Sequence, residues 1–423
     1  MARLTGIAPR LAAWQVLEAV RQGTPFEVAL GQALVELTGP DRRLAHELAA
    51  GTMRAAAALD LAIAPCVEGG LERVDLPIRE ILRLGTYQLT ALDRIPPHAA
   101  VSTSVALART TGHGRAAAFV NAVLRRVADE GPRVVPGRAS HPGWLVTRWT
   151  RRFGPVDAAR LQAWNDTRPR LVAQPARWGL DQIQDTWRRA QVSFELAPFG
   201  AGLMPDATRP ADLPGFDEGG FMIQDAAQAL VVRFFDLPAD AVVYDACAAP
   251  GGKSIAIGRL VRLVVAADRQ LRRVRRLREN LARAGSGREF AAVADAAAPP
   301  VRPVDAVILD APCLGTGVFA RHPDARWRVR PEALARLVAE AGGMIRTVAE
   351  TVRPGGLLCF STCSLEPEEN EVQIEQFLQS DPRFRREPGP APAELITPAG
   401  DLMALPQRHG TDGAYAARLR RIA

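Results

Sequence analysis

The sequence predicts an α/β protein with a Rossmann-like, mostly parallel sheet in its C-terminal part, preceded by an all-α N-terminal part and a small α+β segment. The main observation is a series of short apolar runs after residue 240, each ending near Asp, Pro or Cys. Helical stretches separate the first two runs and the last two, which is typical of a doubly wound sheet carrying ligand groups at the carboxyl ends of its strands. The runs are 241–248, 263–268, 289–295, 304–312 and 355–364.

Helical patterns occupy the N-terminal part of the chain. Apolar residues recur at helical spacing in 79–92 and in 117–130. Residues 131–143 are rich in Pro and Gly and predict a linker. The segment that follows mixes helical with strand-like stretches, which predicts a small α+β subdomain. We therefore expect three domains, at 1–132, 140–215 and 216–423.

The composition indicates a globular enzyme of the cytoplasm. Hydrophobic residues make up 48% and charged residues 23%. No apolar run is long enough to cross a bilayer, and the N-terminal twenty residues predict an amphipathic helix without the apolar core of a signal peptide. The five cysteines are odd in number and irregularly spaced, so we expect neither a disulfide framework nor a bound metal. Association with a membrane and an obligate protein partner are not expected either.

The net charge of +7 and the pI of about 9.8 favour a polyanionic partner. Arginines cluster in two stretches, 271–285 and 319–331. The first is equally well explained as a solvated helix face. The second favours phosphate contact and base stacking, because a histidine and a tryptophan lie among its arginines next to a candidate active site. The residues of this stretch are Arg321, Arg326, Trp327, Arg328 and Arg330.

Lysine is almost absent from this arginine-rich chain. Lys253 is the single lysine among 53 Lys and Arg residues, and it lies in the most glycine-rich turn. Lysine and arginine are not interchangeable where space is tight or where a point charge is needed. We therefore expect the Lys253 ammonium to have a function.

The turn CAAPGGKS at 247–254 allows two interpretations. A phosphate-binding loop of an NTPase is one, but Cys247 stands where that loop requires its first glycine. The other is a Rossmann-type loop, in which glycines let the backbone approach a cofactor. Three carboxylates, Asp268, Asp295 and Asp310, each end an apolar run and so line one crevice. An acidic rim suits a ligand with a sugar and an adenine but no phosphates, and S-adenosyl-L-methionine is such a ligand.

Two thiols and a carboxyl group lie at or just after the carboxyl ends of the two apolar runs 304–312 and 355–364. Methylation at carbon 5 of a pyrimidine needs a thiolate that adds to carbon 6, an acid beside the base, and a second group that removes the carbon 5 proton. The sequence offers Cys363, Asp310 and Cys313 for these three tasks. Cys66 and Cys359 lie in apolar stretches and are expected to be core residues.

Several segments together resemble a known family. CAAPGGK, DAPCLGTGVFARHPDARW and STCSLEPEENE, in this order, are similar to the bacterial RNA cytosine-C5 methyltransferases of class I fold. ILRLGTYQLTALDRIPPHAAV and FVNAVLRRV resemble the NusB-like RNA-binding helical domain. This pairing of domains resembles the 16S rRNA cytosine-C5 methyltransferases of the Sun/RsmB type, which implies 16S rRNA as the partner.

The resemblance implies a role for each matching residue. Asp310 would face the target cytosine and the cofactor, Cys363 would be the nucleophile, and Cys313 would assist product release. Asp268 would hold the ribose hydroxyls, and Asp295 would lie near the adenine. The methionine and ribose end would be lined by Cys247, Ala248, Ala249, Pro250, Gly251, Gly252 and Lys253. Gln224 and Asp225 stand in places that match the segment leading into the catalytic domain.

Two departures and three alternatives accompany this interpretation. The family often has Asp-Gly-Phe-Phe near its C-terminus where this chain has DGAYAARL, and the usual arginine-valine-asparagine strand of the middle region is not evident. One alternative is a phosphate-loop NTPase. Another is an RNA-binding or transcription factor with an idle methyltransferase fold. The third is a C5-methyltransferase that acts on tRNA or DNA.

Overall fold

A computed structural model describes residues 6–131, 140–207 and 209–423. By their internal contacts these residues form two compact units. The first runs to Arg168 and includes Phe319–Arg328, and the second combines Pro169–Val318 with Val329–Ala423. Most of the predicted linker, 132–139, lies outside the described residues, and the predicted division into three domains stays a prediction.

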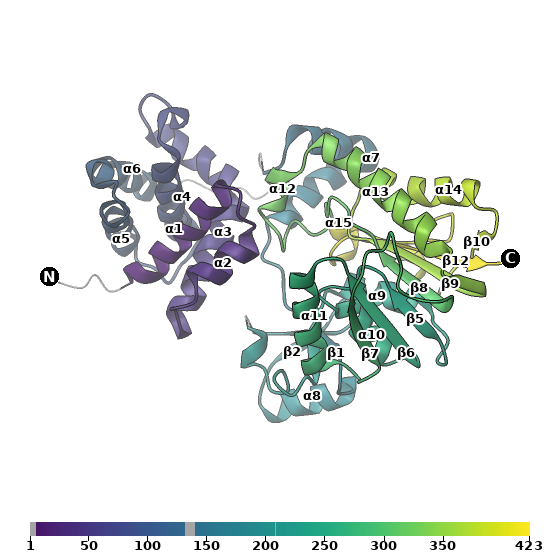
Figure 1. Cartoon of the computed structure of the whole chain (residues 1–423). Coiled ribbons are helices and arrows are strands. Elements are labelled where there is room, and N and C mark those ends of the chain that lie inside the picture. The colour runs from purple at the N-terminus through teal and green to yellow at the C-terminus, as the bar shows by residue number, and fades with distance from the viewer. Residues whose placement is uncertain (1–5, 132–139, 208) are drawn as a thin grey trace. The chain divides into compact units, whose positions relative to one another are not determined.

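The first unit is helical, as the sequence predicts (Figure 1). Its buried core joins apolar side chains from α1 through α6, including Val16, Leu48, Leu82 and Leu124. The long helix α7 is broken at Gly154, where φ is 81° and Pro155 follows, so two helical stretches meet at a kink. The helices are α1 Ile7–Arg21, α2 Phe26–Ala33, α3 Gly39–Ile63, α4 Leu76–Ala91, α5 Pro97–Thr110, α6 Ala117–Glu130, α7 Gly143–Asn165 and α12 Ala325–Arg328.

A small antiparallel sheet opens the second unit. Its strand order is β2-β3-β1-β4, and α8 (Leu180–Arg189) packs Ile183 and Trp187 against it. The mixture of helical and strand-like stretches that the sequence predicts for this segment is confirmed, since β1 and β2 flank α8. The strands are β1 Ala173–Pro175, β2 Phe194–Leu196, β3 Leu203–Pro205 and β4 Phe221–Ile223.

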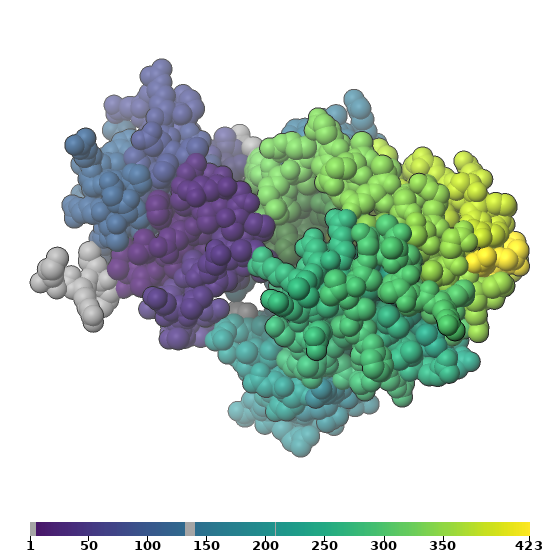
Figure 2. All heavy atoms as spheres, in the orientation of Figure 1, coloured from purple at the N-terminus to yellow at the C-terminus, as the bar shows by residue number. Residues whose placement is uncertain are grey.

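The main sheet of the second unit has eight strands among the described residues, ordered β10-β12-β9-β8-β5-β6-β7, with β11 on β12. From β9 to β7 all neighbours are parallel, and β12 runs antiparallel to β9. Figure 2 shows the C-terminal residues, in yellow, at one edge of this unit. The strands are β5 Val242–Asp245, β6 Leu263–Asp268, β7 Glu289–Val293, β8 Val304–Asp310, β9 Val352–Thr362, β10 Phe384–Arg386, β11 Leu402–Ala404 and β12 Ala414–Arg421.

Helices cover both faces of this sheet, which explains why its strands are uniformly apolar. Ile308 of β8 lies in one buried cluster with α9, α10 and α11, and the next residue, Leu309, lies in a second cluster with α13 and α14. The predicted Rossmann-like α/β class is confirmed. The helices are α9 Ala226–Phe235, α10 Gly252–Gly258, α11 Leu271–Ala284, α13 Pro331–Ala349, α14 Glu371–Ser380 and α15 Pro406–His409.

The strand order fixes where a ligand can bind. From β5 the chain proceeds to β6 and β7 on one side and later to β8 and β9 on the other. Loops that leave neighbouring strands in opposite directions open a crevice at the carboxyl ends of β5 and β8. None of the helices in the described parts of the chain is long and apolar enough to cross a bilayer.

Candidate active site

A pocket of about 250 Å³ lies at the carboxyl ends of the parallel strands. Its wall combines side chains that follow five different strands, so residues far apart in the sequence meet there. The predicted site residues among them are Cys247, Ala249, Asp268, Asp295, Asp310, Cys313 and Cys363.

The two thiols of the predicted site are neighbours. The Sγ atoms of Cys313 and Cys363 are 3.5 Å apart, and both cysteines are free. They come together because β8 and β9 are adjacent and parallel, with Asp310 paired to Ser361. The contact with Cys363, together with burial, raises the pKa of Cys313 well above the ordinary thiol value. Cys313 therefore carries a proton while Cys363 stands beside it.

Both carboxylate oxygens of Asp310 accept a hydrogen bond from a neighbouring side chain. Lys253 Nζ donates to Oδ2 at 2.8 Å, and Ser361 Oγ donates to Oδ1 at 2.8 Å. The Lys253 side chain is buried, so it offers a compact ammonium in a space where a guanidinium would need more room. The position of the single lysine is thus explained by its contact with the carboxyl group beside the two sulfurs.

The glycine turn packs closely against neighbouring elements. At Gly251 φ is 109°, and a Cβ there would lie 2.7 Å from Leu277 Cδ1. A Cβ on Gly252 would lie 2.7 Å from Gln224 Nε2, which gives Gln224 a packing role. Of the turn from 247 to 253, Cys247 and Ala249 lie in the pocket wall, and the Ala249–Pro250 peptide bond is cis.

The carboxylates that end β6 and follow β7 lie in the same wall. Asp268 Oδ1 accepts the Gln270 N–H at 3.0 Å, and Oδ2 is paired with Arg273 at 3.2 Å. Asp295 Oδ1 accepts the Ala297 N–H at 2.9 Å. Burial, reinforced by nearby carboxylates, raises the pKa of Cys247 to about 12, so this thiol is a neutral part of the wall.

A buried glutamate links the two cysteine loops and was missed by the sequence reasoning. Glu369 is 2% exposed, and its Oε1 accepts the Leu314 N–H at 2.9 Å. Burial raises the pKa of Glu369 to about 7. The next residue, Asn370, accepts from Thr362 Oγ1 at 2.5 Å and donates to the Ser364 carbonyl at 2.9 Å. These contacts fix the loop on both sides of the nucleophile candidate.

Two glycines bring the backbone of the Cys363 loop into close contact with other segments of the chain, and they too were missed. Gly317 N–H donates to the Cys363 carbonyl at 3.0 Å, and Gly413 N–H donates to the Gly317 carbonyl at 2.8 Å. A Cβ on Gly317 would lie 2.6 Å from Gly413 Cα. Asp225 secures the same region, because its Oδ1 accepts the N–H of Ala227 and that of Asp412, each at 2.9 Å. The sequence contained one hint of this contact: Asp412 and Gly413 match the first two residues of the Asp-Gly-Phe-Phe segment that the family often has near its C-terminus.

One expectation about the arginine-rich stretch is wrong. Arg326 is fully buried in the first unit, where it is paired with Asp166 and donates to the Asn165 carbonyl at 2.6 Å. It is therefore a structural residue and not a phosphate ligand. Its neighbours Trp327 and Arg328 remain at the surface.

Comparison with known proteins gives matches along the whole chain. The family model for 16S rRNA methyltransferase RsmB/F matches residues 233–420, and the NusB family model matches residues 8–129. A probable ribosomal RNA small subunit methyltransferase B from Synechocystis sp. is 31% identical over 98% of this chain and 100% of its own length. A ribosomal RNA small subunit methyltransferase B from Xanthomonas campestris pv. campestris is 36% identical over 88% of each chain.

Solved structures share the fold. The crystal structure of PH0851 has a TM-score of 0.80 and 21% identity, and the match covers 99% of each chain. The structure of NSun6 from Pyrococcus horikoshii with SFG has a TM-score of 0.60 and 18% identity, and the match covers 67% of this chain and 98% of that one.

Proposed function

The chain belongs to the ribosomal RNA small subunit methyltransferase B family, and from this premise we propose that it methylates carbon 5 of a cytosine in 16S rRNA. The enzyme is an S-adenosylmethionine-dependent rRNA methyltransferase. The proposal adds the base, the atom and a covalent mechanism through Cys363.

The observation that carries the proposal is the pair of sulfurs 3.5 Å apart beside Asp310 in one pocket. Carbon 5 of cytosine is a poor nucleophile until a thiolate adds to carbon 6. Methylation of an exocyclic amine needs acceptors that orient the amine, and it needs no thiol. Two thiols and a carboxyl group at the carboxyl ends of neighbouring strands therefore favour carbon 5 chemistry.

In the proposed sequence Cys363 adds as a thiolate to carbon 6, and the C5–C6 bond becomes an enamine. Asp310, oriented by Lys253 and Ser361, engages the edge of the base where charge develops. S-adenosylmethionine, when bound, supplies the electrophilic methyl group that carbon 5 takes up. Cys313 then loses its own proton to water, and its thiolate takes the proton from carbon 5. The electron pair of the broken C5–H bond restores the C5–C6 double bond while the bond between Cys363 and carbon 6 breaks, and Cys363 leaves as a thiolate.

The contact between the two sulfurs suits this order of events. The neighbouring Cys363 is the first cause of the raised pKa of Cys313. Once Cys363 is bonded to carbon 6 it no longer carries a thiol or a thiolate, so this cause disappears. The proton of Cys313 is then held less tightly at the step that requires a base.

The pocket offers groups that fit the cofactor. The Asp268 carboxylate is 3% exposed and lies at the end of β6, where it can accept from ribose hydroxyl groups. We expect Asp295 to lie near the adenine and the turn from Cys247 to Lys253 to surround the methionine end. Lys253 would act there through Asp310, since its ammonium is bound to that carboxylate.

Transfer of a labelled methyl group from S-adenosylmethionine to naked 16S rRNA, small subunit particles, tRNA and DNA tests the proposal. Bisulfite sequencing of the modified RNA then reports the base. We expect one new 5-methylcytosine in 16S rRNA. Modification of tRNA or DNA alone would assign a different substrate, and a modified base other than cytosine would contradict the proposed target.

A further inference from the structure

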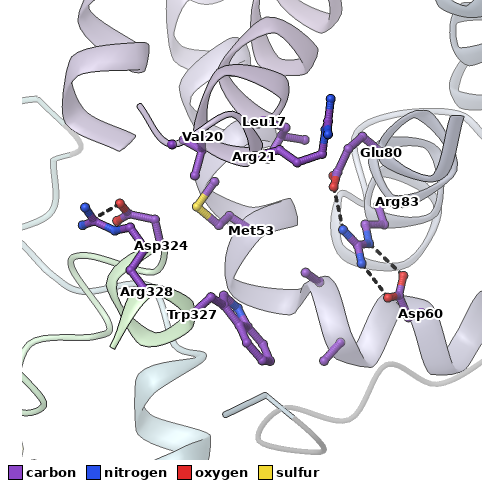
Figure 3. A pocket seen from close by; sticks show the side chains of 13 residues that line it. Leu17, Val20, Arg21, Met53, Asp60, Glu80, Arg83, Asp324, Trp327 and Arg328 are labelled. Carbon is purple, nitrogen blue, oxygen red and sulfur yellow. Dashed lines mark hydrogen bonds and ion pairs between the residues drawn. The ribbon is translucent and has the colours of Figure 1, made fainter. Parts of the chain in front are cut away.

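A second pocket, of about 560 Å³, lies within the first unit (Figure 3). It is formed by α1, α3 and α4 together with the end of the segment Phe319–Arg328, and it shares no residue with the pocket that contains the two catalytic thiols. Its volume is within the range of about 300–1,000 Å³ typical of small-molecule sites. Neither the proposed chemistry nor the core of the helical unit requires such a space.

One wall of this pocket is an exposed aromatic ring. Trp327 of α12 is 40% exposed, and its indole and Met53 of α3 both line the pocket (Figure 3). Leu17, Ala56 and Ala57 extend the apolar surface. A large aromatic side chain that is partly exposed at a pocket is typical of a surface that stacks against a planar ligand.

The segment that carries Trp327 is anchored on both sides of the ring. Arg326 is buried against Asp166, and Asp324 Oδ2 accepts the Phe26 N–H at the start of α2 at 3.2 Å. Arg328 in turn is paired with Asp324 at 2.9 Å. The ring is thus held in place before any ligand arrives, which reduces the entropy lost on binding.

The other side of the pocket carries a cluster of three charged side chains, Asp60, Glu80 and Arg83 (Figure 3). Arg83 donates Nε to Asp60 Oδ1 at 2.7 Å and Nη1 to Glu80 Oε1 at 2.6 Å. The three groups line the pocket and offer both hydrogen-bond acceptors and N–H donors. An apolar peptide side chain seated here would desolvate these charges without a partner, whereas the edge of a nucleobase presents donors and acceptors to them. Arg21 and Arg328 at the rim can contact phosphate.

We propose that this pocket binds an unpaired nucleotide of the RNA substrate, with its base stacked on Trp327 and its edge toward Arg83, Asp60 and Glu80. The inference rests on the proposed function in so far as the substrate is RNA. The bound nucleotide is not the methylated cytosine, because the catalytic thiols belong to the other pocket. The base must be unpaired, since only then are its face and its edge both accessible.

Direct binding of the full-length protein to a labelled 16S rRNA transcript and to a short unstructured RNA tests the inference. Stacking on an aromatic side chain contributes about 1–3 kcal/mol per base, so Trp327→Ala should weaken binding about 5- to 150-fold. Trp327→Phe should restore most of it. Ala57→Phe, which fills the pocket from α3, should weaken binding while the melting temperature stays that of the wild type. Val35→Ala removes an apolar side chain that is exposed outside the pocket and should leave binding unchanged.

The inference is overturned if Trp327→Ala and a folded Ala57→Phe both bind RNA within about twofold of the wild type. It is also overturned if the variants bind naked RNA normally and lose only the methylation of protein-containing particles, since the pocket would then take a protein segment. Binding is measured without turnover. A wild-type protein that binds RNA through Trp327 but transfers no methyl group would therefore refute the proposed function and leave the pocket assignment intact.

Discussion

Gly317→Ala should displace the loop that carries Cys363, the proposed nucleophile. The added Cβ would lie 2.6 Å from Gly413 Cα and 2.8 Å from the carbonyl oxygen of Cys363, and both of these are backbone atoms that no side-chain rotation can move away. Overpacking of this kind costs about 1–3 kcal/mol of stability. A displacement of about 1 Å at a reacting atom can reduce the rate about 100-fold. We therefore expect a folded enzyme with a modest loss of stability and a large loss of turnover.

The assay combines steady-state methyl transfer with thermal unfolding and with direct binding of S-adenosylmethionine. Cofactor affinity should stay close to that of the wild type, because Gly317 is not part of the pocket wall. Gly343→Ala is the matched control, since no described atom lies within 4 Å of a Cβ at this position in α13 and alanine favours a helix by about 1 kcal/mol. Turnover by Gly317→Ala within about twofold of the wild type would refute the positioning role of the glycine contact.

Three further predictions concern the residues around the thiols. Cys313→Ala should accumulate an RNA–protein adduct visible on a denaturing gel, because the step that releases Cys363 is blocked. Cys363→Ala should form no adduct and show no turnover. Normal turnover by Cys363→Ala would disprove the proposed nucleophile. Lys253→Met should lower kcat about tenfold, because the variant loses one charge-assisted hydrogen bond to Asp310, worth about 1.5 kcal/mol. An unchanged kcat at saturating substrates would contradict this role of Lys253. Glu369→Gln should change how the free energy of unfolding depends on pH. In the folded protein the pKa of Glu369 is about 7, above the ordinary value of 4.5. The protonated carboxyl group therefore contributes its full stability below about pH 4.5, and this contribution is lost as the pH rises through 7. Relative to the wild type, the variant should gain up to about 3 kcal/mol between pH 4.5 and 8 in denaturant titrations, and parallel stability curves would rule out the shift.

The local sequence was sufficient to predict the parallel part of the sheet. Buried parallel strands are apolar on both faces, so the run at 304–312 was recognisable without knowledge of its partners, and it forms β8. Parallel neighbours also bring their carboxyl ends to one edge. This is why Asp310, Cys313 and Cys363 could be predicted to converge before any geometry was known.

Features that depend on pairing between distant segments could not be predicted. The antiparallel strand β12 is defined by its register with β9, for instance Ala417 opposite Phe360, and no local pattern encodes that partner. Arg326 belongs to a strongly basic stretch, so its composition suggested an RNA contact. Arg326 is instead buried because it pairs with Asp166, a residue far away in the sequence. The packing of Gly317 on Gly413 is hidden for the same reason.

The covalent step through Cys363 is the central claim, and trapping it is the most direct test. RNA in which the cytosines carry fluorine at carbon 5 has no proton there to remove, so the enzyme cannot release the methylated base. With S-adenosylmethionine present, we predict a stable RNA–protein adduct whose peptide mass maps to Cys363. The absence of an adduct from an active enzyme, or an adduct on another residue, would contradict the account.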